Sequence, residues 1–155
     1  MAYQKLQAGQ ALAVIPSDTI PVPNPSATAG SGTAAAPTGA QLVGTATTFT
    51  SSVVVGDIIY DSSNSVAATV LAVVSDTVLT TSAAIATGAS YIIYSQANNP
   101  SNGCVLYVGV AGDLKVKTVG GDIVTIVAAP AGYHPIQVTQ VFATGTAATD
   151  ILALW

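Results

Sequence analysis

The sequence predicts an all-β protein built from two modules. Val, Ile, Thr and Gly are plentiful and Glu is absent, and no capping box precedes a stripe of apolar residues at helical spacing. Short β-rich runs are instead separated by turn-forming residues about every 10 positions. These observations favour a β-sandwich with an inserted small β-barrel. A jelly roll is one form that the sandwich can take.

The first predicted strand covers residues 11–15, and a Pro-rich arm follows it. Pro16, Pro21, Pro23 and Pro25 lack a backbone N–H, so this segment suits an extended edge and not a central strand. Because the arm is already extended, it loses little entropy when it lies across a neighbouring subunit. We therefore predict that residues 1–25 belong to the sandwich and that these four prolines contribute to an interface.

An inserted module is expected next. Residues 26–39 are rich in Ala, Ser, Thr, Gly and Pro, which predicts a low-complexity linker. A small β-module is predicted at 40–97, and a loop rich in Asn ends it. Its predicted strands are 42–49, 57–60, 67–74, 77–79 and 91–94, each ended by a Gly, Asp or Asn turn.

Residues 103–155 are predicted to complete the sandwich. Gly-Asp turns favour a meander of strands 104–110, 114–118 and 123–128, followed by strands 136–142 and 151–155. Lys115 and Lys117 share one strand face, which indicates solvent or an interface. Trp155 ends an apolar strand, so we expect it to be either a core plug or an interface anchor.

The charge content is unusually low. Half of the residues are apolar and 6% are charged, all of them Lys or Asp, whereas soluble domains average about 25% charged residues. A free monomer normally stays dispersed through a charged surface. We therefore expect a homo-oligomer, with a trimer as one option, whose surface is covered by neighbours. The alternative is a compact monomer with a hydroxyl-rich surface.

The same composition argues against two classes of partner. A net charge of −4 with three Lys and no Arg argues against nucleic-acid binding, which needs clustered cations. The shortage of cations also argues against anionic membranes, and no apolar run approaches the roughly 20 residues of a spanning helix. The apolar stretch 11–15 is too short for the core of a signal peptide, so we expect folding in a cytoplasm.

No motif predicts catalysis, a cofactor or a metal. His134 is interpreted as a surface or interface residue, and Cys104 as a small buried residue of a strand. The aspartates suit turns, with a calcium site at Asp57/Asp61 or Asp113/Asp122 as the alternative. Four tyrosines lie in predicted strands and suggest core packing, with a carbohydrate-binding platform as the other option: Tyr60, Tyr91, Tyr94 and Tyr107.

The C-terminal block carries a series of turn and strand motifs. In order, these are a GG-D turn at 120–122, a P-A-G turn at 130–132, a P-x-Q-V strand at 135–138 and an ATGT segment leading to the ending ALW. This order, and the opening MAYQKLQAGQALAVIPSDTIPVPNP, resembles small virion structural proteins of tailed bacteriophages. The likeness covers most of the chain, and its motifs contain no catalytic residues.

The resemblance implies a structural role in the virion. It points to a capsid decoration or cement protein that stabilises a phage head lattice through contacts with the major capsid protein or other virion proteins. Assembly would take place in the cytoplasm of the bacterial host. The alternative that the resemblance leaves open is a tail, fibre or head-spike module that binds a host-surface glycan or receptor.

Overall fold

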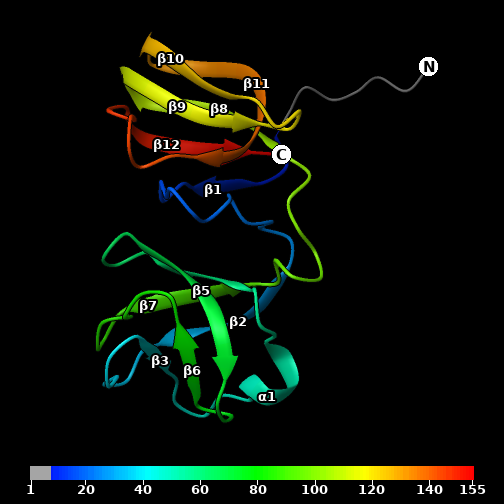
Figure 1. Ribbon diagram of the computed structural model, residues 1–155, viewed down its shortest axis with the longest axis vertical. Helices are drawn as coiled ribbons and strands as arrows, with labels where there is room; N and C mark the ends of the chain where they lie inside the picture. The colour runs from blue at the N-terminus through cyan, green and yellow to red at the C-terminus, as the bar shows by residue number, and fades with distance from the viewer. Residues whose placement is uncertain (1–7) are drawn as a thin grey trace, which may run out of the picture. The chain divides into compact units, whose positions relative to one another are not determined.

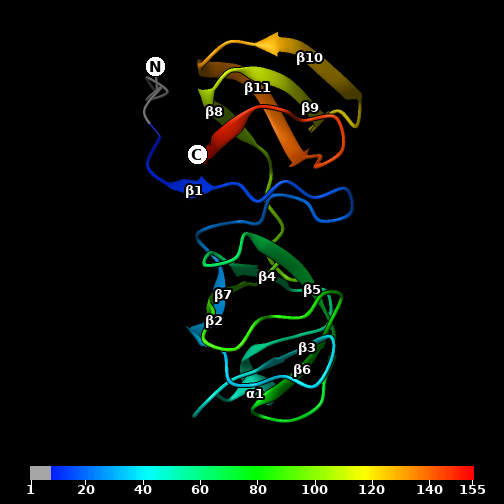
Figure 2. The ribbon, with the colours of Figure 1, turned by 90° about the vertical axis from the view of Figure 1, so that its left-hand side faces the viewer.

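The computed structural model describes residues 8–155, and these consist almost entirely of β-structure (Figures 1 and 2). Unit 1 combines the chain up to Pro25 with Ser101–Trp155, and unit 2 is continuous from Ser26 to Pro100. Each unit is built on one six-stranded antiparallel sheet, which confirms the predicted all-β fold. The first seven residues of the predicted segment 1–25 lie outside the described residues.

Unit 1 uses strands from both ends of the chain. Their order in the sheet is β1-β12-β8-β11-β9-β10. Their bounds are β1 (Ala11–Ala13), β8 (Cys104–Val110), β9 (Gly112–Thr118), β10 (Ile123–Ala129), β11 (Gly132–Val141) and β12 (Thr149–Leu154). The first and last strands of the described chain therefore pair with each other.

Strands β8 and β9 are not neighbours in this sheet, which corrects the predicted meander. Only Ala111 separates the two strands, and the tightest common hairpin loops contain two residues. The chain therefore turns a corner, and β11 pairs with β8 along its first part and with β9 along its last part. Gly112 permits this corner, because a Cβ there would lie 2.6 Å from the backbone nitrogen of Ala148. The predicted hairpin of β9 and β10 is present.

The corner lets strands on both sides of it contribute to one core. Leu106 and Val108 of β8 and Leu114 and Val116 of β9 are fully buried, and Val138 of β11 joins them. Burying a side chain of this size stabilises a fold by about 1.5–3 kcal/mol. Unit 1 thus has a hydrophobic core of its own.

Unit 2 holds the other six strands in the order β2-β7-β4-β5-β6-β3. Their bounds are β2 (Thr28–Thr33), β3 (Gln41–Val43), β4 (Ile58–Asp61), β5 (Val66–Val73), β6 (Val78–Thr81) and β7 (Ser90–Tyr94). The sheet curls into a half-barrel. Its two edges approach each other where Ala35, just after β2, forms a β-bridge with Val43 of β3.

The half-barrel encloses a second core, formed mainly by Leu42, Phe49, Leu79, Ile85 and Ile93. Three of the four tyrosines singled out in the sequence are buried in this unit: Tyr60, Tyr91 and Tyr94. Burial raises the pKa of the Tyr91 and Tyr94 hydroxyls. Core packing is therefore the correct interpretation for these three, and they offer no exposed platform for a sugar.

The predicted linker at 26–39 contains strand β2, which is a correction. The glycines of β2 leave space for large side chains of β7, the neighbouring strand in the sheet. A Cβ on Gly32 would meet the Tyr91 hydroxyl at 3.0 Å, and a Cβ on Gly30 would lie 3.8 Å from Ile93. The low complexity of the segment thus reflects close packing of two strands.

A short helix, α1 (Phe49–Ser52), replaces the end of the predicted strand 42–49. Asp76 holds this turn in place. Its backbone oxygen accepts hydrogen bonds from the Phe49 N–H and the Thr47 hydroxyl, and its carboxylate accepts the N–H and hydroxyl of Thr50. These contacts span more than 25 positions of sequence, so no local pattern indicates them.

Candidate functional site

The sheet of unit 1 carries apolar side chains on both of its faces. In β12, Ile151 and Ala153 are buried in the core, whereas Leu152 between them is 37% exposed. In β8, Leu106 is buried and Tyr107 points to the opposite face. An antiparallel sheet with one solvated face normally alternates apolar and polar residues. The outward face of this sheet does not follow that rule.

Strand register aligns the outward apolar side chains into rows. Ala13 lies opposite Leu152, and Leu152 lies opposite Tyr107. Tyr107 in turn lies opposite Tyr133 of β11. A shorter row beside it crosses β1, β12 and β8 in the same way. We call the two rows together the outer apolar face: Ala11, Ala13, Val105, Tyr107, Tyr133, Leu152 and Leu154.

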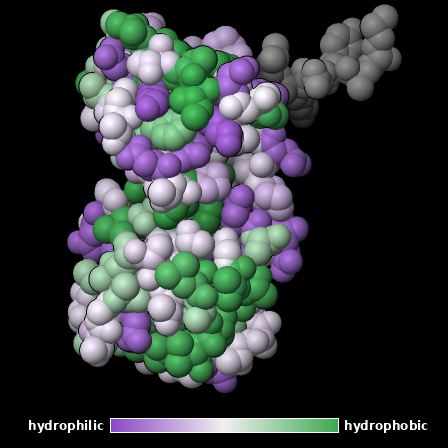
Figure 3. Space-filling model, in the orientation of Figure 1, coloured by the Kyte–Doolittle hydropathy of each residue, from purple (hydrophilic) through white to green (hydrophobic). Residues whose placement is uncertain are grey.

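Tyr133 is the most exposed large side chain of the outer apolar face. Its side chain is 74% exposed, and its ring meets that of Tyr107 edge to face, with centroids 5.2 Å apart and planes at 68°. Tyrosine has few rotatable bonds and combines an apolar ring with a polar end, which suits it to protein contacts. Figure 3 shows that hydrophobic residues reach the surface of both units.

The Pro-rich arm lies against unit 1. The Ser17 N–H donates a hydrogen bond of 2.9 Å to the Val141 carbonyl. The Asp18 carboxylate accepts hydrogen bonds from the N–H and hydroxyl of Thr144, at 2.9 and 2.6 Å. The arm is therefore held by its own subunit along the stretch between β1 and Pro25.

The four prolines differ in how much surface they leave free. Pro23 is buried, and Pro16, Pro21 and Pro25 are half-buried. Pro23 therefore offers little surface to a partner, whereas the other three each retain an exposed side. Their role in an interface stays a prediction.

Trp155 packs on the core of unit 1 with its ring half-buried. The backbone N–H of Trp155 donates a hydrogen bond to the Gln10 carbonyl at 3.1 Å, and its backbone carbonyl accepts one from the Gly9 N–H at 2.6 Å. Of the two predicted roles, this placement supports the core plug. A role for Trp155 as an interface anchor stays a prediction.

Three of the four aspartates considered as calcium ligands accept hydrogen bonds from N–H groups through their carboxylates. Asp57 accepts two from backbone N–H groups, and Asp61 accepts two from backbone N–H groups and one from the Asn64 amide. Asp113 accepts the Ala128 N–H at 2.8 Å. Within residues 8–155, no three His, Cys, Asp or Glu side chains lie close enough together to hold a metal ion. The carboxylates of Asp57, Asp61 and Asp113 therefore act as hydrogen-bond acceptors, within turns and between distant segments.

His134 and Cys104 both lie in the interior of unit 1. His134 is 9% exposed, which corrects its interpretation as a surface or interface residue. Its Nε2 lies 2.9 Å from the Pro130 carbonyl, and because a carbonyl only accepts, Nε2 carries the proton. Cys104 is buried as predicted, and burial raises the pKa of its thiol to about 12. Neither side chain is placed to react with a substrate from solution.

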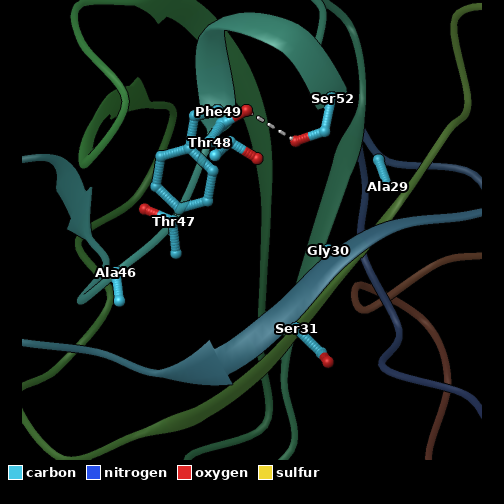
Figure 4. Close-up of a pocket in the computed structure, with 8 residues that line it drawn as sticks. All are labelled: Ala29, Gly30, Ser31, Ala46, Thr47, Thr48, Phe49 and Ser52. Carbon is cyan, nitrogen blue, oxygen red and sulfur yellow. Dashed lines mark hydrogen bonds between the residues drawn. The ribbon is translucent and has the colours of Figure 1, made fainter.

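Unit 2 has a shallow hollow of about 230 Å³ between β2 and α1 (Figure 4). Hydroxyl side chains from both elements line it, together with Phe49, and the Ser52 hydroxyl donates a hydrogen bond to the Thr48 carbonyl. Small-molecule pockets usually measure about 300–1,000 Å³ and combine apolar walls with convergent polar groups. This hollow is smaller and holds no titratable group.

No family model, curated protein or solved structure matches this chain. Across the part of the chain that the structure describes, no helix is both long enough and apolar enough to cross a membrane.

Sequence reasoning did not single out the outer apolar face. A signal for part of it was present, because apolar residues occupy both alternation phases of 151–155 and of 104–108. Tyr133 was missed because it follows a turn, and nothing local indicates that β11 places it beside Tyr107. The two chain segments that carry the predicted site residues both belong to unit 1, where β1 pairs with β12, and Trp155 bonds Gly9 and Gln10, which precede the four prolines.

Proposed function

We propose that this chain is a structural protein of a tailed-phage virion, with capsid decoration or cement as its specific role. In this proposal the outer apolar face of unit 1 binds the major capsid protein or another virion protein. Many copies would together stabilise the head lattice. The proposal assigns the chain no catalytic activity, no cofactor or metal, and no nucleic-acid or membrane partner.

The observation that carries the proposal is the sheet with apolar residues on both faces. The outer face is built on paired strands and includes Tyr107, Tyr133 and Leu152. Exposed contiguous apolar surfaces of this kind are typical of protein interaction sites. Asp150 is the one charged residue among the outward positions of β8 and β12, so charge contributes little to this surface.

The composition supports a protein that works in many copies. With 6% charged residues, the chain has few means of staying dispersed other than covering its surface with neighbours. A homo-oligomer within a virion, assembled in the bacterial cytoplasm, meets that need. Each unit has its own core, and in this proposal unit 1 supplies the binding surface through the outer apolar face.

The hydroxyl-lined hollow of unit 2 supports a second candidate function, which is binding of a host glycan. A tail, fibre or head-spike module that binds a host glycan needs polar groups that can bond sugar hydroxyls, and Ser31, Thr47 and Ser52 line the hollow. Phe49 lies beside them but is 2% exposed, so its ring cannot serve as a stacking platform. This absence of an exposed ring favours the capsid role over the glycan role.

A binding assay on phage heads tests the proposal. Heads that lack this protein are mixed with the purified chain, and bound protein is measured after sedimentation of the heads. We expect saturable binding at hundreds of copies per head, reduced at least tenfold by Leu152→Asp. The matched control Ser31→Asp adds the same charge on an exposed residue of unit 2 and should bind like the parent. Equal binding of the parent and Leu152→Asp would reject the outer apolar face as the contact.

A further inference from the structure

Strand β10 forms an open edge of the unit 1 sheet. It stands last in the strand order and pairs only with β9. Thr118 and Asp122 form a hydrogen-bonded pair, because the Thr118 N–H donates to the Asp122 carbonyl. Hydrogen-bonded pairs alternate along an antiparallel register, so the N–H and C=O groups of Val124 and Ile126 point toward β9. The corresponding groups of Ile123 and Thr125 therefore point away from the sheet. Val127 follows them at the start of the register shift between Ile126 and Ala129.

Before the register shift that follows Ile126, this edge has none of the features that normally protect an edge strand. Protected edges are short, carry charges or Pro, or contain a β-bulge. The seven residues of β10 (Ile123–Ala129) include no charge and no Pro, and their one irregularity is the register shift between Ile126 and Ala129. Val127 is 74% exposed and Ile123 is 57% exposed. By contrast, the other edge strand, β1, has three residues, and in unit 2 the edges meet at the Ala35–Val43 bridge. In unit 2 the edge strand β2 has six residues, so β10, with seven, is the longest edge strand among residues 8–155.

We propose that β10 pairs with β10 of a second copy of this chain, antiparallel and across a two-fold axis at Thr125. The outward-pointing positions 123, 125 and 127 are symmetric about Thr125. Self-pairing therefore sets Thr125 opposite its own copy and Ile123 opposite Val127 of the partner subunit. Pairs of β-branched residues directly opposite each other stabilise a sheet, and a two-fold interface requires such self-complementarity.

Charge explains why a second copy suits this edge. Because β10 is uncharged, its symmetry mate introduces no like charge into the paired strands. The nearest cations on the same face are Lys115 and Lys117, opposite Thr125 and Ile123 on β9. Lys115 would stand three strand spacings from its symmetry mate, or about 14 Å at 4.7–4.9 Å per strand, and Lys117 would stand farther from its own mate because the two are also offset along the strands. Both distances exceed the screening length of about 8 Å at physiological salt, so the lysines do not oppose pairing.

The pairing deepens the proposed structural role by naming a contact between copies, but it forms in the purified protein without a phage head. Sedimentation of the full chain at micromolar concentration should show a two-fold dimer. Val127→Lys should raise the dissociation constant at least tenfold, because two lysines would enter the paired edge. The matched control Val74→Lys replaces a valine of unit 2 that is 60% exposed and should leave the dimer intact. A monomeric parent, or a dimer that Val127→Lys leaves unchanged, would overturn the pairing.

Cross-linking tests the register separately. Thr125→Cys should form an intersubunit disulfide by itself, since residues opposite each other in a hydrogen-bonded pair have Cα atoms about 5.5 Å apart. Ile123→Cys and Val127→Cys should each cross-link poorly alone and readily when the two proteins are mixed. Cys104 is buried and does not interfere. Efficient cross-linking of Ile123→Cys to itself, or a trimer without cross-links at Thr125→Cys, would contradict the proposed axis.

The two proposals fail independently. If the disulfide-linked dimer forms but does not bind phage heads, the capsid role is wrong and the pairing stands. If heads bind the chain and the parent sediments as a monomer, the pairing is wrong and the capsid role stands.

Discussion

Tyr133 of β11 lies edge to face against Tyr107 of β8, with ring centroids 5.2 Å apart, and 74% of the Tyr133 side chain remains exposed. An aromatic pair of this geometry contributes about 0.5–1.5 kcal/mol beyond the area that it buries. Here most of one ring still faces water, so the pair contributes less to the fold than to a surface that a partner can cover. Leu152 extends that surface on the other side of Tyr107.

Tyr133→Ala should separate binding from stability. Because the ring is mostly exposed, we expect the free energy of unfolding to fall by less than about 1 kcal/mol. Binding to phage heads should weaken by more than tenfold if Tyr133 is a central contact residue, which corresponds to about 1.4 kcal/mol or more. Urea unfolding and head binding measured on the same preparation check this. A large loss of stability with unchanged binding would place Tyr133 in the fold alone.

Trp155→Ala should act on the stability of unit 1. The ring packs on the core but is half-buried, so we expect a loss of about 2 kcal/mol, below the 3–5 kcal/mol typical of fully buried aromatic residues. The midpoint of urea unfolding measures this. If stability is unchanged and head binding weakens, Trp155 is instead the interface anchor that its terminal position also allows.

Gly112→Ala should destabilise the corner between β8 and β9. The added Cβ would lie 2.6 Å from the Ala148 backbone nitrogen, so strand β9 or the segment before β12 must move. We expect a loss of roughly 2–3 kcal/mol, in the range of overpacked cores. Gly120→Ala is the matched control, because its Cβ would meet nothing closer than 3.6 Å. Equal melting temperatures for the two variants would show that the corner tolerates a side chain.

Asp18 should titrate below the ordinary aspartate pKa of 3.8, because the hydroxyl and the N–H of Thr144 both stabilise its carboxylate. These bonds therefore hold the arm at pH values above the unfolded pKa, and their contribution is lost as the pH falls through the folded pKa. An NMR titration of the Asp18 carboxyl carbon measures the midpoint. Thr144→Val removes the hydroxyl and should move the midpoint upward. A midpoint of 3.8 or higher in the parent would contradict this account.

Local sequence patterns predict much of the strand content. Cys104–Val110 matches the predicted strand in both bounds, and β10 differs from its prediction by one residue. The patterns work there because alternation and Gly turns are local properties of the backbone. They fail at β2, where Gly30 and Gly32 suggest a flexible linker although their lack of side chains lets the strand pack on Tyr91 and Ile93.

The order of strands and the outer apolar face depend on distant contacts. The segment 104–118 looks like a hairpin until β11, which begins 14 residues later, is placed between its two halves. Likewise, Tyr133 becomes part of a surface only through its register with Tyr107 and, beyond it, Leu152. Sequence alone indicates that β12 is apolar on both faces, but it does not show which strands continue that surface.

The most direct measurement is a cryo-EM map of the phage particle that contains this chain. The account predicts hundreds of copies on the head, with the outer apolar face of unit 1, centred on Tyr107, Tyr133 and Leu152, buried against a virion protein. A map that shows this face in solvent, or that finds a few copies at the tail tip with unit 2 turned toward the host, would contradict it.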